Sequence, residues 1–157
     1  MLNIVDAEPL RLGWGRIWQS GEAGAILHHG EVPDPRMTVS MIGVFADPYS
    51  HLALAVSMGD EPDAQGKYPT LPDETLLAMV QMITDALACG INVIIHCLEG
   101  KYRSTYMDAA VHMKILDYSV DQALGRIKAM HPIAELRKDS RDQLVRMQSV
   151  LRGDGEK

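Results

Sequence analysis

The sequence lacks the features that place a protein in a membrane or outside the cell. Among its 157 residues there are only two cysteines, Cys89 and Cys97, which are too few for a disulfide framework and fit a reducing compartment. No apolar run approaches the roughly 18 residues needed to cross a bilayer, and no basic-then-apolar signal segment opens the chain. We therefore expect a cytoplasmic protein that does not insert into membranes.

The chain also has fewer basic than acidic residues. The chain has 15 lysines and arginines against 21 aspartates and glutamates, so its net charge is −6 and its pI is near 5.4. Such a surface repels phosphate backbones and anionic lipids as a whole, although a local positive pocket can still exist. Nucleic-acid binding is therefore not expected.

The length and composition are those of a single domain. A chain of 157 residues with 46% hydrophobic content can bury a core without disulfides or metals. We find no internal repeat and no low-complexity tract, and the polar tail 153–157 is expected to fray. We predict one domain over residues 1–157.

Short apolar segments alternate with proline and glycine in the amino-terminal half, a pattern typical of strands. We predict strands at 2–5, 16–18, 38–45 and 52–56 and a short helix at 23–29. A longer, continuous apolar segment at 91–96 predicts one further strand.

Helical periodicity begins after Pro72. The first apolar stripe, which predicts a helix ending near Cys89-Gly90, consists of Leu76, Val80, Ile83 and Leu87. Three later stripes are Met107/Val111/Ile115, Val120/Leu124/Ile127 and Leu144/Met147/Leu151. The last two follow predicted capping boxes, Ser119…Gln122 and Ser140…Gln143. Strands followed by helices favour an α/β fold with a central mixed, mostly parallel sheet flanked by helices.

The most informative segment follows the 91–96 strand and reads His96-Cys97-Leu98-Glu99-Gly100-Lys101-Tyr102-Arg103-Ser104. It contains no proline, so every backbone N–H can donate, and a loop of this length at a helix N-terminus can cradle a phosphate. Gly100 permits a turn with positive φ, and Arg103 can bind two phosphate oxygens at once. We predict a phosphate-binding loop between the last core strand and a helix, with residues 96–103 as its substrate-binding candidates.

Cys97 is the predicted nucleophile of this loop. A thiol that faces converging amides, a helix N-terminus and a guanidinium loses its proton more readily and can attack phosphorus. Ser104 can donate to the sulfur and make it a better leaving group, while His96 is expected to orient the loop. A lone cysteine is usually a small buried hydrophobe and a lone arginine a solvated charge, but their combination with Gly100 and Ser104 favours the phosphate site.

This segment resembles the signature of the protein tyrosine phosphatase superfamily, HCxxGxxR followed by Ser or Thr. The chain length, the segment 118–124, His131-Pro132 and Gln143-Leu144 are most similar to the compact dual-specificity branch, over roughly residues 15–150. The resemblance implies that Cys97 attacks the phosphorus and that Arg103 binds the phosphate, with no metal or cofactor. It implies phosphotyrosine, and phosphoserine or phosphothreonine, as substrates.

The resemblance also implies a general acid, an aspartate on a loop some thirty residues before the cysteine. Asp60 and Asp63 lie 37 and 34 residues before Cys97. Asp60 directly follows the predicted strand and is our choice, with Asp63 as the alternative. Asp73 reads better as a first-turn residue favoured by the helix dipole.

Other substrates remain open. Lys101 occupies a position where tensin-type phosphoinositide phosphatases carry lysine, which hints at polyanionic substrates, but Leu98 replaces their second lysine and Glu99 adds negative charge. The alternatives are a phosphatase of a phosphoinositide or RNA 5′-phosphate and a phosphate-binding module without catalysis. Cys89 could pair with Cys97 under oxidation, but a helix-end residue is the simpler interpretation. The histidines outside the loop show no metal-ligand spacing and are predicted to be surface or capping residues: His28, His29, His51, His112 and His131.

Overall fold

The computed structural model describes residues 3–4, 9–43 and 50–153, and the structural statements below concern these ranges. Within them the sheet order is β1-β2-β5-β3-β4, with β1 antiparallel to β2 and all other pairs parallel. The strands are β1 (Asn3–Ile4), β2 (Ile17–Gly21), β3 (Arg36–Ser40), β4 (Leu52–Ala55) and β5 (Asn92–Cys97). The predicted mixed, mostly parallel sheet is confirmed.

Strand β5 lies at the centre of the sheet and is buried on both faces, as its continuous apolar run predicts. It pairs in parallel with β2 on one side and with β3 on the other. Val93, Ile95 and Cys97 belong to the large core cluster, whereas Ile94 packs with a smaller cluster. Because side chains alternate along a strand, this register places the thiol of Cys97 on the same face as the main core.

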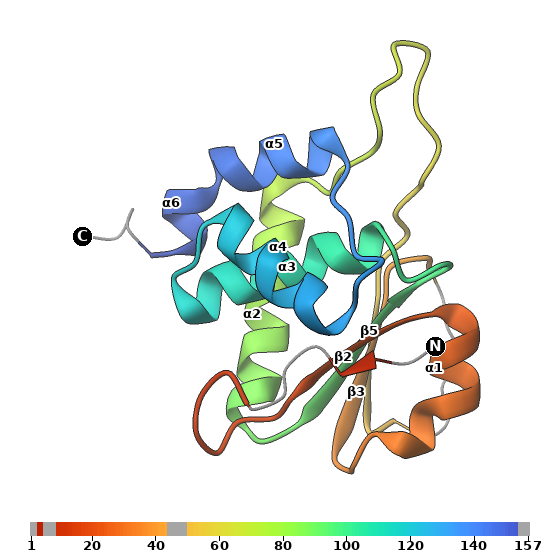
Figure 1. Cartoon of the computed structure of the whole chain (residues 1–157), viewed down its shortest axis with the longest axis vertical. Coiled ribbons are helices and arrows are strands. Elements are labelled where there is room, and N and C mark those ends of the chain that lie inside the picture. Colours follow the sequence, from red (N-terminus) through yellow and green to blue (C-terminus); the bar gives the residue numbers. More distant parts are fainter. Residues whose placement is uncertain (1–2, 5–8, 44–49, 154–157) are drawn as a thin grey trace.

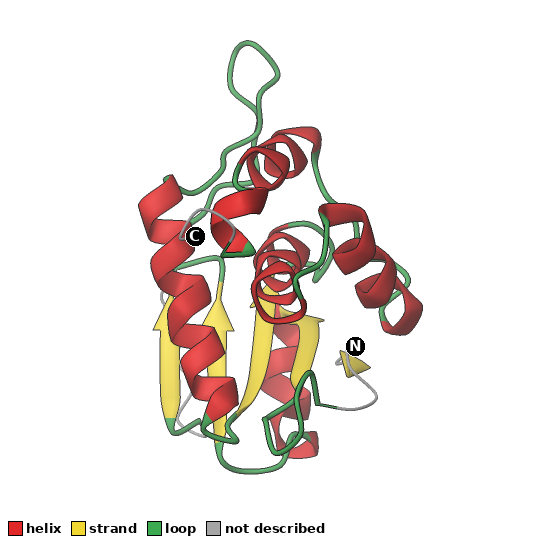
Figure 2. Cartoon of the chain, turned by 90° about the vertical axis from the view of Figure 1, so that its left-hand side faces the viewer, coloured by secondary structure: helices red, strands yellow, loops and turns green. Residues whose placement is uncertain are grey.

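Helices cover both faces of the sheet (Figures 1 and 2). The single helix α1 lies on one face, and the remaining helices gather on the other. In chain order the helices are α1 (Glu22–His28), α2 (Asp73–Ala88), α3 (Arg103–Leu116), α4 (Val120–Met130), α5 (Lys138–Arg146) and α6 (Gln148–Leu151), with a 3-10 turn η1 (His29–Glu31) after α1. In the described ranges, none of these helices is both long enough and apolar enough to span a membrane.

Most predicted elements are present, with shifted ends. The 16–18 and 38–45 segments form β2 and β3, which are displaced by a few residues, and Phe45 lies outside the described residues, as do Leu2 and Val5. The first helical stripe is buried throughout α2, which ends at Cys89 with Gly90 at φ 81°. The Ser119…Gln122 capping box is confirmed in both its hydrogen bonds. Because the apolar pattern reports burial rather than hydrogen bonding, it predicts the presence of an element more accurately than the residues at which the element begins and ends.

The second capping box is wrong. Helix α5 begins at Lys138, so Ser140 lies inside it and is buried, and the N-cap residue Arg137 makes no side-chain capping bond. Gln143 instead reaches across the core, where its amide nitrogen donates to the carbonyl oxygen of Leu71 at 2.7 Å. The stripe that ends in Leu151 is also divided, because α5 stops at Met147 and α6 follows. Long-range hydrogen bonds have overridden the local pattern.

Candidate active site

The segment 98–102 forms a loop between the end of β5 and the start of α3, as the sequence predicts. It lies at the carboxyl edge of the parallel strands, with β2 on one side of β5 and β3 on the other. In open α/β sheets this edge is where ligands bind. The loop therefore stands at the position that the fold class favours for a site.

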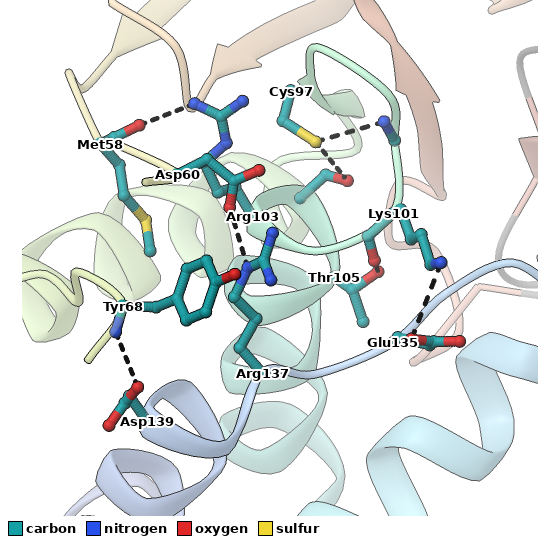
Figure 3. A network of polar contacts seen from close by, with 12 residues as sticks. Met58, Asp60, Tyr68, Cys97, Lys101, Arg103, Thr105, Glu135, Arg137 and Asp139 are labelled. Atoms are coloured by element: carbon teal, nitrogen blue, oxygen red, sulfur yellow. Dashed lines mark hydrogen bonds and ion pairs between the residues drawn. The ribbon is translucent and has the colours of Figure 1, made fainter. Parts of the chain in front are cut away.

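The Cys97 thiol is buried beneath this loop, with 2% of the residue exposed. Its Sγ accepts a hydrogen bond from the backbone N–H of Gly100 at 3.2 Å and lies 3.4 Å from Oγ of Ser104 (Figure 3). The sulfur therefore lies within hydrogen-bonding distance of a loop amide and of the Ser104 hydroxyl.

Gly100 is held in the turn by the strand next to it. Its φ is 74°, and a Cβ at this position would lie 2.6 Å from the backbone nitrogen of Gly21. Both the backbone angle and the close approach require glycine. The carbonyl oxygen of Gly100 lies 2.6 Å from Nε2 of His131 and accepts a weaker hydrogen bond from Gln19 at 3.3 Å. Because a carbonyl only accepts, His131 carries its hydrogen on Nε2.

Ser104 is oriented by Gln19, a buried residue of β2. Nε2 of Gln19 donates to Oγ of Ser104 at 3.0 Å and to Oγ1 of Thr105 at 2.6 Å. Thr105 in turn donates to the carbonyl oxygen of Lys101 at 2.7 Å. Since Ser104 accepts from Gln19, its own hydroxyl hydrogen can point toward the sulfur of Cys97.

Arg103, at the first position of α3, connects the loop to the segment that follows β4. One terminal nitrogen, Nη1, donates to the carbonyl oxygen of Met58 at 2.8 Å (Figure 3). Its buried Nε has no hydrogen-bond partner among the described residues and is therefore a donor that a phosphate oxygen could use.

A small cavity opens above the thiol. Its lining residues come from the loop, from the start of α3 and from the segment after β4: Asp60, Cys97, Leu98, Glu99, Tyr102 and Arg103. The predicted loop residues His96, Gly100 and Lys101 do not line this cavity, and His96 is fully buried. Lys101 instead pairs with Glu135 at 3.8 Å, and the Tyr102 hydroxyl, followed by the Glu135 charge, raises the pKa of Lys101.

Known structures share this fold over nearly the whole chain. DUSP15 matches with a TM-score of 0.76 and 19% identity, covering 98% of this chain and 94% of its own. PTPMT1 matches with a TM-score of 0.71 and 17% identity, covering 99% of both chains. A mouse dual specificity phosphatase crystallised with zinc tungstate matches with a TM-score of 0.62 and 20% identity, covering 96% of this chain and 94% of its own.

The chain has the dual-specificity phosphatase fold. At these identities the likeness concerns the fold, and the chain matches no family model and no curated protein.

The two acid candidates occupy different places in this dual-specificity phosphatase fold. Asp60 lines the cavity together with Cys97. The carboxylate of Asp63 accepts the backbone N–H groups of Gln65 and Lys67, both at 2.9 Å, and so closes the tip of its own loop. Asp73 lies in the first turn of α2, as predicted, and pairs with Arg146 at 2.7 Å. Of these three aspartates, Asp60 is the one that lines the cavity containing the Cys97 thiol.

The sequence did not predict the roles of three residues that support the site. Gln19 and His131 bond to the loop, and Arg137 bonds to Asp60. His131 caps α4, in line with the prediction, but it is buried, and so is His112, which was wrongly placed at the surface. Each of these contacts joins residues more than 30 positions apart, so no local pattern could have indicated them. Cys89 is the exposed helix-end residue that was predicted.

Proposed function

We propose that this chain is a cysteine-dependent protein phosphatase that hydrolyses phosphotyrosine, and also phosphoserine and phosphothreonine. The observation that carries the proposal is the thiol of Cys97 in a cavity that it shares with Arg103 and Asp60, with the Gly100 amide 3.2 Å from the sulfur. A nucleophile, an anion ligand and a proton donor are the three groups that phosphomonoester hydrolysis requires. The reaction uses water as the acceptor and needs no metal or cofactor.

In the first step the Cys97 thiolate attacks phosphorus, an S–P bond forms, and the ester P–O bond breaks. Arg103 and the loop amides hold the equatorial phosphate oxygens as negative charge builds on them. Asp60 donates its proton to the departing oxygen and becomes a carboxylate. The products are a cysteinyl phosphate and the free alcohol or phenol.

In the second step water attacks the cysteinyl phosphate. The Asp60 carboxylate takes a proton from the water, the S–P bond breaks, and inorganic phosphate leaves. The Ser104 hydroxyl, 3.4 Å from the sulfur, donates to the returning thiolate and makes it a better leaving group.

Exchange of the nucleophile tests the proposal directly. We expect Cys97→Ser to abolish hydrolysis of aryl phosphates while the protein still binds phosphate or vanadate, because the loop and Arg103 remain. The measurements are steady-state turnover of 4-nitrophenyl phosphate and calorimetric titration with vanadate. Wild-type protein that binds vanadate but turns over no phosphoester would support a non-hydrolysing binding module and contradict the proposal.

Asp60→Asn and Asp63→Asn together test the choice of the acid. A positioned general acid contributes typically about 10²–10⁴ in rate. We expect Asp60→Asn to lower turnover of substrates with poor leaving groups by a factor in that range, and Asp63→Asn to have little effect. The reverse result would assign the acid to Asp63.

A second candidate substrate class is polyanionic, such as a phosphoinositide headgroup. A shallow hollow of about 390 Å³ adjoins the cavity and shares Tyr102 with it. Its lining includes three cationic side chains, Lys67, Arg137 and Lys138, against one acidic one, Asp139. PTPMT1, which shares this fold, has been crystallised with PI(5)P. Parallel assays on phosphopeptides, inositol lipids and 5′-phosphorylated RNA decide between protein and non-protein substrates.

A further inference from the structure

A long loop, residues 56–72, protrudes between β4 and α2 and carries Asp60 near its start (Figure 2). Arg137 contacts both the outgoing part of this loop, at Asp60, and its returning part, at Tyr68. Nε of Arg137 donates to Oδ1 of Asp60 at 2.9 Å, and the guanidinium carbon lies 3.7 Å from the ring centre of Tyr68 on the returning part (Figure 3). The same carbon lies 3.9 Å from the ring centre of Tyr102 in the phosphate loop.

The Arg137 side chain therefore contacts three places: the acid Asp60, the returning part of the loop that carries Asp60, and the loop between β5 and α3. The Arg137 side chain is only 20% exposed and that of Asp60 32%, so this ion pair is sheltered compared with a fully solvated one. Two aromatic contacts and one hydrogen bond through Nε fix a planar guanidinium in a way that a flexible ammonium cannot reproduce.

A second arginine fixes the backbone nearby. Arg103 binds the carbonyl oxygen of Met58, two residues before Asp60. Arg103 is the ligand that would turn toward a bound phosphate, whereas Arg137 belongs to the connection between α4 and α5 and does not line the catalytic cavity. When substrate binds, Arg137 is thus the contact that can stay with the acid.

We propose that Arg137 is a positioning residue that holds Asp60 in the orientation from which it protonates the leaving group. The inference rests on the proposed phosphatase function. Because Arg137 engages Oδ1, the transferable proton is carried by Oδ2, which passes it to the ester oxygen as the P–O bond breaks. The carboxylate that results then faces the guanidinium, which stabilises it until it takes a proton from the attacking water.

The test compares Arg137→Ala with Arg141→Ala, a matched control on α5 whose guanidinium pairs with Asp121 at 2.6 Å. The substrates are 4-nitrophenyl phosphate, with a good leaving group, and phenyl phosphate, with a poor one. A misplacement of about 1 Å at an active site can cost up to 10²-fold, so we expect Arg137→Ala to lower kcat/KM for phenyl phosphate by about 10- to 100-fold and to affect 4-nitrophenyl phosphate much less. The affinity of Arg137→Ala for vanadate should be unchanged. Arg141→Ala should match the wild type in kcat/KM on both substrates.

The double variant Asp60→Asn/Arg137→Ala makes the test specific. If Arg137 acts through Asp60, the double variant should be as active as Asp60→Asn alone, because the residue through which Arg137 acts is already lost. Arg137→Lys should recover only part of the loss. An equal loss on both substrates, or a full additional loss in the Asp60→Asn background, overturns the inference while the phosphatase proposal stands. If the wild type hydrolyses neither substrate, the phosphatase proposal fails and this inference fails with it.

Discussion

At the scale of single residues, the loop owes its shape to buried polar side chains from distant parts of the chain. Gln19 from β2 and His131 after α4 both bond to the carbonyl oxygen of Gly100. Buried donors and acceptors cost free energy unless they are paired, so these bonds favour one loop conformation over its alternatives. The same glutamine also determines which way the Ser104 hydroxyl can turn.

Gln19→Leu should therefore slow the second chemical step. Without the amide, Ser104 is free to turn away from the sulfur, and a lost hydrogen bond of about 1 kcal/mol corresponds to roughly a fivefold lower rate. We expect a fall of that size in kcat, with accumulation of cysteinyl phosphate visible as a larger burst of product. Rapid-quench measurement of the burst checks this.

Thr105→Val is the matched control for Gln19→Leu. It removes the other hydroxyl that Gln19 bonds, while keeping the side-chain shape. It should lower stability without enlarging the burst. A burst that is enlarged equally by Thr105→Val would show that loop stability, rather than the orientation of Ser104, controls the step.

At the scale of elements, a polar network fastens the start of α2 to α3 and α5. The Tyr106 hydroxyl of α3 donates to the side-chain oxygen of Gln143 and accepts from the backbone N–H of Leu71 at 3.3 Å. Burial is the main cause that raises the pKa of Tyr106, so the hydroxyl stays protonated and can donate. Gln143 also donates to Asp73 at 2.9 Å, next to the Arg146 ion pair.

This network makes stability depend on pH in the acid range. Hydrogen bonds from Arg146 and then Gln143 hold the pKa of Asp73 at about 2, below its ordinary 3.8. A carboxyl group whose pKa is lower in the folded protein stabilises it above the unfolded pKa, and that stability is lost as pH falls through the folded value. We expect the contribution to disappear between about pH 4 and pH 2.

Asp73→Asn should therefore flatten the fall of stability over this pH window, as measured by urea unfolding at a series of pH values. Glu74→Gln, which removes a carboxylate from the same helical turn, is the control. An unchanged slope in Asp73→Asn would show that the ion pair with Arg146 adds nothing to acid stability.

At the scale of the whole molecule, one large apolar cluster extends from the sheet into the helices. It includes Val93 and Ile95 of β5, Ile83 of α2 and Met107 of α3. The smaller cluster on the other face contains Trp18. Both clusters share the central strand, so neither face can keep its packing after β5 is lost.

Consequently, the chain should unfold in a single transition. Tryptophan fluorescence reports on both faces, because Trp14 packs against the large cluster and Trp18 lies in the small one. Denaturant curves from fluorescence and from far-UV circular dichroism should coincide. Two separated midpoints would contradict the prediction of one domain over residues 1–157.

The sequence by itself determined the class of fold, the central strand and the loop that joins β5 to α3. These features are local: an apolar run of strand length, helical stripes such as Leu76 to Leu87, and nine consecutive residues whose backbone and side chains act together. Gly100 at φ 74° is the clearest case, since its place in the motif already required a turn of this kind.

Only the tertiary structure decided which aspartate shares the cavity with Cys97 and what holds it there. The sequence favoured Asp60 over Asp63 only through its place after the predicted strand. In the structure Asp60 is the one of the two that lines the cavity, and the Arg137 that binds it is 77 residues away. Gln143, expected to cap a helix, is drawn instead into a bond with Leu71, 72 residues away. Such contacts depend on how elements pack, because a buried polar group takes the partner that the fold brings to it, and spacing along the chain does not carry that information.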